Sequence, residues 1–171
     1  NLSGMSVITR GPKDMYHDGT AKALTFSADE AYYLDGKRLI YSSGTIGQEG
    51  AVYYLESDPF TKVIVHGTYT TSTANTWFEV QSSTGQICYY GNTTGARQSY
   101  TAGNSPRIYA WYLDYVEDPL GNYMNYTYNK WSYCMYPNTI MYGNNKNGST
   151  GLQNTVTFSY ETRSNDPQLF V

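Results

Sequence analysis

Tyrosine makes up 20 of the 171 residues, and most of these tyrosines stand in alternating runs. Two examples are Trp111-Tyr-Leu-Asp-Tyr-Val116 and Tyr123-Met-Asn-Tyr-Thr-Tyr128. Tyrosine favours strands, and it combines a large apolar ring with a hydrogen-bonding tip. Successive side chains of a strand point to opposite faces of the sheet. The runs therefore predict a sheet whose two faces are both amphipathic, suited to lining a wall, a groove or an interface.

Turn residues divide the chain into short β runs, and almost no helical period is present. Asp35-Gly36, Ser82-Ser-Thr-Gly85 and the stretch from Glu117 to Asn122 read as hairpin turns. Strands that recur about every 10 residues with turn signals between them are typical of an all-β fold. We expect antiparallel hairpins that form one twisted, curved sheet or an open sandwich.

Two polar stretches, residues 67–76 and 92–105, read as loops. The best helical stretch, residues 27–31, is too short to stand alone. The expected strands are Leu2 to Thr9, Ala23 to Ser27, Glu30 to Leu34, Arg38 to Ser42, Val52 to Leu55, Lys62 to His66, Trp77 to Gln81, Gln86 to Tyr90, Trp111 to Val116, Tyr123 to Tyr128, Asn138 to Tyr142 and Thr155 to Glu161.

Length and charge exclude several classes of protein. Residues 1–171 fit a single β-rich domain with its own core. The net charge is −3 without a Lys/Arg stripe, so we expect no nucleic-acid partner. No run of 18 apolar residues is present, so we expect no membrane span in this segment. Because the chain begins at Asn1, we expect it to be a piece of a much larger protein.

The titratable residues offer weak signals for chemistry. His17 lies between Asp14 and Asp18, which would suit an acid–base or metal group, but a polar turn before Gly19 is the favoured interpretation. His66 reads as a residue at a strand end. No known nucleophile, phosphate-binding or zinc motif occurs. We therefore expect no enzyme activity, no cofactor and no metal.

Three carboxylates, Asp114, Glu117 and Asp118, cluster at the end of an expected strand. Paired carboxylates at roughly 5–10 Å could act on a glycosidic bond. Asp118-Pro-Leu-Gly-Asn122 is also a good turn, and we favour that interpretation. Cys88 and Cys134 lie on separate expected strands and read as two thiols, although a bridge between them stays open.

Aromatic side chains are the one feature with direct functional content. Such rings can fill one face of a twisted sheet, which is the favoured interpretation, or they can form a binding platform for carbohydrate or peptide. The residues of the candidate platform are Trp77, Trp111, Trp131, Tyr112 and Tyr126.

Four motifs in order give the chain a resemblance to a known family. They are Asn1-Leu-Ser-Gly4 with Ile8-Thr-Arg10; Trp77-Phe-Glu-Val80 with Gly85 and Tyr89-Tyr-Gly91; Pro106-Arg107-Ile108-Tyr109-Ala110-Trp111-Tyr112-Leu113 with Asp118, Gly121-Asn122 and Tyr126-Thr-Tyr128; and Ile140-Met-Tyr-Gly143-Asn144. Together they resemble the SpvB/Tc-toxin-B amino-terminal region, which is found upstream of Rhs/YD-repeat shell proteins.

The resemblance implies a structural function. It implies a non-catalytic module in the encapsulating β-shell of a secreted bacterial virulence protein, whose shell encloses an effector segment. The implied partners are the shell strands and the effector segment of the same polypeptide, and unpaired sheet edges suggest self-association. The alternative, from the aromatic residues, is a cell-surface carbohydrate-binding module.

Overall fold

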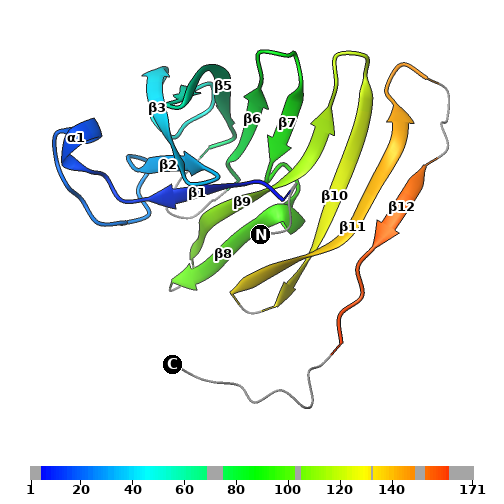
Figure 1. Cartoon of the computed structure of the whole chain (residues 1–171). Helices are drawn as coiled ribbons and strands as arrows, with labels where there is room; N and C mark the ends of the chain where they lie inside the picture. The colour runs from blue at the N-terminus through cyan, green and yellow to red at the C-terminus, as the bar shows by residue number, and fades with distance from the viewer. Residues whose placement is uncertain (1–4, 69–74, 103–104, 132, 149–152, 162–171) are drawn as a thin grey trace.

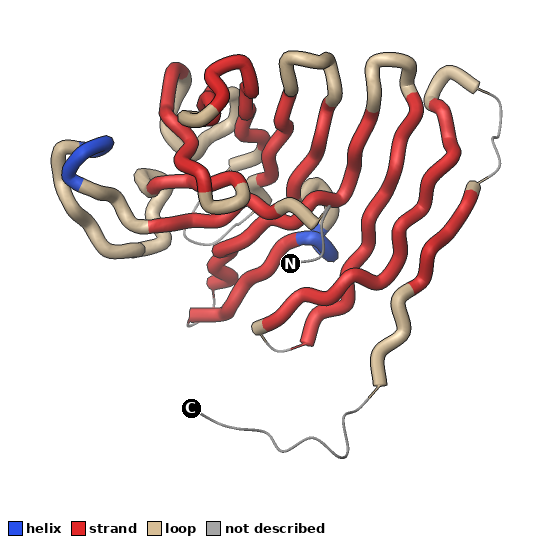
Figure 2. Tube along the Cα trace, viewed as in Figure 1, coloured by secondary structure: helices blue, strands red, loops and turns tan. Residues whose placement is uncertain are grey.

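The computed structural model describes residues 5–68, 75–102, 105–131, 133–148 and 153–161. Strands dominate this part of the chain, and the two helices are single short turns (Figure 2). None of the helices among the described residues is long and apolar enough to cross a membrane. The elements are β1 (Val7–Gly11), α1 (Met15–Asp18), β2 (Ala31–Leu34), β3 (Lys37–Ser43), β4 (Val52–Leu55), β5 (Asp58–His66), β6 (Trp77–Gln81), β7 (Ile87–Tyr90), the 3-10 turn η1 (Thr94–Ala96), β8 (Arg97–Ala102), β9 (Ser105–Glu117), β10 (Asn122–Trp131), β11 (Cys134–Asn145) and β12 (Asn154–Thr157).

The sheet closes on itself. Antiparallel pairs run in the order β1 to β7, β7 then pairs with β9, and β9 pairs back onto β1 (Figure 1). Closure of this kind removes free edges from the strands that take part. Beyond β9 the sheet continues as an open extension of β10, β11 and β12, on the side of the molecule away from α1.

Strand β9 is the junction of the fold, because four strands pair with it. Its first half pairs with β8 and, over residues 110–112, with β1. Its second half pairs with β7 and, over residues 115–117, with β10. The 13-residue length of β9 lets it hold the ring closed and start the extension at once.

Trp111 of β9 lies at the centre of the core and is fully buried. Its ring makes edge contacts with Phe78 and Tyr32, at centroid distances of 4.9 and 5.9 Å. Its indole N–H donates a hydrogen bond to the carbonyl oxygen of Thr76 at 2.7 Å. Gly91 lies so close to this ring that a side chain at position 91 would collide with it. Aromatic edge contacts of this kind add to the free energy of burial.

A buried ion pair lies beside this aromatic centre. Arg10 and Glu30 are 3.1 Å apart, with side chains 0% and 3% exposed. The guanidinium of Arg10 also lies over the ring of Trp111, 5.2 Å from its centroid. The second oxygen of Glu30 accepts hydrogen bonds from the backbone N–H groups of Thr25 and Ser27 at 2.6 and 3.1 Å. The pair therefore fastens the long connection between β1 and β2 to the core.

The all-β prediction is confirmed, and so is the Asp35-Gly36 hairpin, in which both residues have positive φ, 51° and 80°. The strand expected at residues 23–27 is wrong, because the Glu30 carboxylate takes the backbone N–H groups that a strand would offer to a neighbour. The single turn α1 was not predicted. Asp14 caps it by accepting a hydrogen bond from the backbone N–H of His17.

The prediction of a loop at residues 92–105 is also wrong, because this stretch contains η1 and β8. β8 has a polar sequence, and its place in the sheet comes from its pairing with β9. The last strand, β12, ends at Thr157 and not at Glu161. Residues 2–4 of the first expected strand and most of the loop 67–76 lie outside the described residues.

The buried ion pair generates a stability prediction. Glu30→Gln leaves the Arg10 charge buried without its counter-ion, and we expect a loss of about 3–5 kcal/mol in the free energy of unfolding, measured in urea. Asp29→Asn is the matched control, because it breaks the neighbouring pair with Lys13, in which Asp29 is 55% exposed. It should cost about 1 kcal/mol or less. Equal losses in the two variants would contradict the role given to the buried pair.

Gly91 generates a second prediction. Gly91→Ala should lose about 1–2 kcal/mol for a side chain at positive φ and about 1–3 kcal/mol more for overpacking against Trp111. Gly19→Ala is the control, because Gly19 has nearly the same φ, 65° against 67°, and nothing within 4 Å of an added Cβ. Urea unfolding of the two variants isolates the contact with Trp111. A Gly91→Ala loss no larger than that of Gly19→Ala would disprove it.

Candidate functional site

The extension of β10, β11 and β12 leaves the closed ring at its junction with β9. β10 pairs with β9 only over residues 123–125, whereas it pairs with β11 along its whole length. The β10–β11 pairing is irregular after Tyr123 and after Thr127, and such irregularities bend a strand pair. Figure 1 shows the two long strands running past the ring, with β12 beyond them.

Contacts with the ring anchor the near side of this extension. Met124 and Tyr126 pack against the core cluster. The Tyr128 hydroxyl donates a hydrogen bond to the carbonyl oxygen of Leu113 in β9 at 2.6 Å. Met135 of β11 is buried, whereas all four residues of β12 are exposed. β10 and β11 are therefore partly buried, and burial is lost at β12.

The extension and the segment that follows it expose many large hydrophobic side chains. Among the described residues, half of the 12 exposed large hydrophobic side chains lie between residues 131 and 160. They are Trp131, Tyr133, Tyr136, Tyr142, Val156 and Tyr160. β12 pairs with β11 on one side, and among the described residues no strand pairs with its other side. A free edge is a template for a further strand, and β12 (Asn-Thr-Val-Thr) carries none of the charges or prolines that block such pairing.

The five aromatic residues of the predicted platform do not form one surface. Trp111 is the clear correction, because it is fully buried in the core and offers no face to a ligand. Tyr126 packs against the core, and half-buried Tyr112 lies 5.3 Å from the Tyr128 ring. Half-buried Trp77 stacks on His66, with centroids 4.1 Å apart. Trp131 alone is strongly exposed, at 76%, and it stands at the end of β10.

A different aromatic row, which sequence reasoning missed, crosses five neighbouring strands. It consists of His66, Trp77, Tyr89, Tyr115 and Tyr123. Tyr115 stacks with Tyr89 and with Tyr123 at 5.0 and 5.5 Å, and Trp77 contacts Tyr89 edge-on at 5.2 Å. The alternation within each strand could have placed these residues on the face opposite the core, but it does not tell which strands are neighbours. Three of these four ring contacts are stacked and one is edge-on, so the row joins strands side by side.

The three clustered carboxylates are each engaged in the structure. Asp114 is buried, which raises the pKa of its carboxyl, and one of its oxygens accepts from the backbone N–H of Thr93 at 2.5 Å. Glu117 accepts from the Tyr115 hydroxyl at 2.7 Å and is paired with Lys146. Lys146 and Tyr115 lower the pKa of Glu117.

Asp118 accepts from the backbone N–H groups of Leu120 and Asn122, both at 2.9 Å, so its interpretation as a turn residue is confirmed. The two cysteines are free thiols, with Cys88 half-buried and Cys134 exposed. Among the described residues no group of three or more His, Cys, Asp and Glu side chains is arranged to hold a metal ion.

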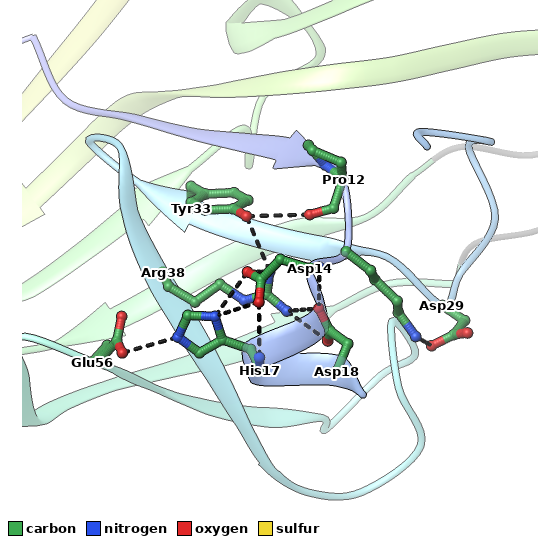
Figure 3. Close-up of polar contacts among 9 residues, drawn as sticks. Pro12, Asp14, His17, Asp18, Asp29, Tyr33, Arg38 and Glu56 are labelled. Carbon is green, nitrogen blue, oxygen red and sulfur yellow. Dashed lines mark hydrogen bonds and ion pairs between the residues drawn. The ribbon is translucent and has the colours of Figure 1, made fainter. Parts of the chain in front are cut away.

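A polar cluster surrounds α1 at the opposite end of the molecule (Figure 3). His17 Nδ1 lies 2.8 Å from Asp14 Oδ2, and His17 Nε2 lies 2.9 Å from Glu56 Oε1. Arg38 of β3 donates from one nitrogen to both carboxylate oxygens of Asp18, each at 2.7 Å. The expectation of a polar turn at His17 is confirmed, but its link to Glu56 was not predicted, because 39 residues separate them.

Comparison with known proteins agrees with the motifs. The family model described as Salmonella virulence plasmid 65kDa B protein, SpvB, matches residues 56–133, which run from the β4–β5 turn to the β10–β11 turn. No curated protein sequence matches the chain significantly.

Solved structures share the fold at low sequence identity. The N-terminal domain of the effector protein SpvB from Salmonella typhimurium strain LT2 is 16% identical with a TM-score of 0.66, over 96% of this chain and 63% of that one. TcdB2-TccC3 is 15% identical with a TM-score of 0.62, over 81% of this chain and 8% of that one. The Tc holotoxin pore of Photorhabdus luminescens is 16% identical with a TM-score of 0.62, over 87% and 8%. The chain thus spans less than two thirds of each of these structures. Family match, shared fold and ordered motifs agree: the chain carries an SpvB/Tc-toxin-like region.

Proposed function

We propose that the chain is a non-catalytic β-module that contributes strands to the wall of an encapsulating shell in an Rhs/Tc-like secreted bacterial toxin or effector. The observation that carries the proposal is the open extension of β10, β11 and β12. No described strand pairs with the outer edge of its last strand, which carries no charge, and six large hydrophobic side chains between residues 131 and 160 are exposed. A protein working as a monomer blocks such an edge, whereas a wall section offers it to the next strand.

The coverage of the solved structures supports a place in a longer polypeptide. The region that resembles this chain makes up only about 8% of the TcdB2-TccC3 structure. The proposed partners are therefore further strands and the enclosed segment of the same polypeptide. The closed ring, with its own core around Trp111, would give the module a rigid base, and the extension would be the part that joins its neighbours.

The aromatic and acidic residues support a structural function over a catalytic one. Trp111 is buried, and Tyr115 in the row from His66 to Tyr123 stacks with two other rings, so these residues offer few open ring faces to a sugar. The Asp118 carboxylate accepts a backbone hydrogen bond within its turn, and the Glu117 carboxylate is bound by Lys146 and Tyr115. A catalytic carboxylate must have an oxygen within hydrogen-bond reach of its substrate.

The free edge of β12 generates a test in two parts. The chain alone should self-associate with rising concentration in sedimentation velocity experiments, because the unpaired edge and the exposed apolar side chains near it can pair with a second copy. Val156→Lys places a charge on β12 and should reduce this association. Tyr16→Lys is the control, because Tyr16 is also exposed, at 88%, but lies on α1 far from the extension, and it should leave the association unchanged.

In the second part, hydrogen exchange compares the chain alone with a longer polypeptide that includes its natural flanking sequence. The amides of β12 that face away from β11 should exchange slowly only in the longer polypeptide, where they gain a neighbouring strand. A monomer at all concentrations, together with equal exchange of β12 in both forms, would overturn the proposal.

A further inference from the structure

Both histidines of the chain lie between two carboxylates. The ring nitrogens of His17 face Asp14 and Glu56 at 2.8 and 2.9 Å. The ring nitrogens of His66 face Glu49 and Glu79 at 3.0 and 3.2 Å. In each case the carboxylates come from two different parts of the chain, so each histidine bridges two segments.

A neutral imidazole has one N–H donor and one acceptor nitrogen, whereas carboxylates accept only. A histidine between two ionised carboxylates satisfies both of them only when both of its nitrogens carry a proton. Loss of that proton turns one hydrogen bond into a contact between a nitrogen lone pair and a carboxylate oxygen. The observed geometry around His17 therefore belongs to the charged imidazolium.

Helix α1 depends on such polar contacts, because it buries none of its four residues. Met15 and Tyr16 are 67% and 88% exposed. The residues of α1 itself are joined to the rest of the fold by the ion pairs of Asp18 with Arg38 of β3 and of His17 with Glu56 in the turn after β4. Arg38 stays charged at any physiological pH. The link through His17 is the fastening that titrates.

Asp14 couples this link to the helix itself. One of its oxygens accepts from the backbone N–H of His17 at 2.8 Å, which caps α1, and the other accepts from the His17 ring. Arg38 also faces Asp14, at 3.7 Å. Asp14 therefore keeps a cationic neighbour when His17 is neutral, so the contact weakened most by deprotonation is the one to Glu56.

The segment around α1 also walls a pocket of about 240 Å³ against β3. Its lining includes Leu39, Ile40, Ile46 and Tyr53. The charged groups that share this pocket with His17, from the segment and from β3, are Lys13, Asp18, Asp29, Glu30 and Arg38.

We propose that His17 is a protonation-dependent clasp, which fastens the α1 segment, residues 12–30, to the turn after β4 and opens one wall of this pocket when its proton is lost. The Arg38–Asp18 pair and the buried Arg10–Glu30 pair keep the segment attached in the open state, so the clasp changes local order without unfolding the ring.

The pH range follows from the two sides of the clasp. Hydrogen bonds to Glu56 and then to Asp14 raise the pKa of His17 above its ordinary value of 6.5. The stabilisation from His17 is therefore complete below pH 6.5 and is lost as the pH rises through the raised pKa. Hydrogen bonds from His17 lower the pKa of Asp14 below 3.8. The stabilisation from Asp14 is therefore complete above pH 3.8 and is lost as the pH falls through the lowered pKa. The clasp is closed between these limits.

The test follows the His17 ring by NMR and the amides of Asp18 and Gly19 by hydrogen exchange, in the whole chain across this pH range. These two amides make the hydrogen bonds of α1, to Asp14 and Met15. Their protection factors, corrected for intrinsic exchange, should fall as His17 deprotonates. Glu56→Gln should lower the pKa of His17 toward 6.5. His17→Gln should give low protection without pH dependence.

His66→Gln is the matched control, because it removes the other histidine with two carboxylate neighbours and should leave the α1 protection factors and their pH dependence unchanged. A His17 pKa at or below 6.5 in the unaltered chain would overturn the proposal. Constant protection across the titration of His17 would overturn it too, and so would a pH dependence that persists in His17→Gln. Glu56→Gln keeps the test decisive if His17→Gln does not fold.

Discussion

The packing of Trp111 at the junction strand β9 is the interaction on which the rest of the structure depends. Four strands pair with β9. The indole of Trp111 contacts side chains of β2 and β6, which lie elsewhere in the closed sheet. The Arg10 guanidinium covers the same ring and is neutralised by Glu30, which holds the connection between β1 and β2. Trp111 thus connects the closure of the sheet to the buried ion pair, and the strand that carries it also begins the extension.

Local signals in the sequence predicted much of the fold, and long-range pairing accounts for what they missed. Alternating runs and the Asp35-Gly36 turn correctly indicated antiparallel hairpins, because strand period and turn chemistry are local properties. β8 was missed because its polar sequence lacks alternation and its place depends on β9. Residues 23–27 looked like a strand, but Glu30 takes their hydrogen bonds. The pairing of β1 with β9 could not be predicted from local sequence, because about 100 residues separate the two strands.

The same limit applies to the candidate site. The sequence showed that aromatic residues matter, but it could not show that Trp111 is buried while Trp131 is exposed, because both stand in similar runs. The cross-strand row from His66 to Tyr123 requires knowing which strands are neighbours. The link between His17 and Glu56 requires the fold as well, whereas the turn at Asp118 needed only its local sequence.

The pairing of β1 with β9 has a consequence for how the chain acquires its structure. Residues 7–9 pair with residues 110–112, so the ring cannot close until almost all of β9 has been synthesised. Until then β1 has an unpaired edge, and the hairpins between them lack the indole that fills their common centre. Contacts of such high sequence separation slow folding, because the entropy of a long loop is lost before the contact forms. Folding should therefore wait for β9, and the nascent chain is most open to aggregation just before that strand emerges.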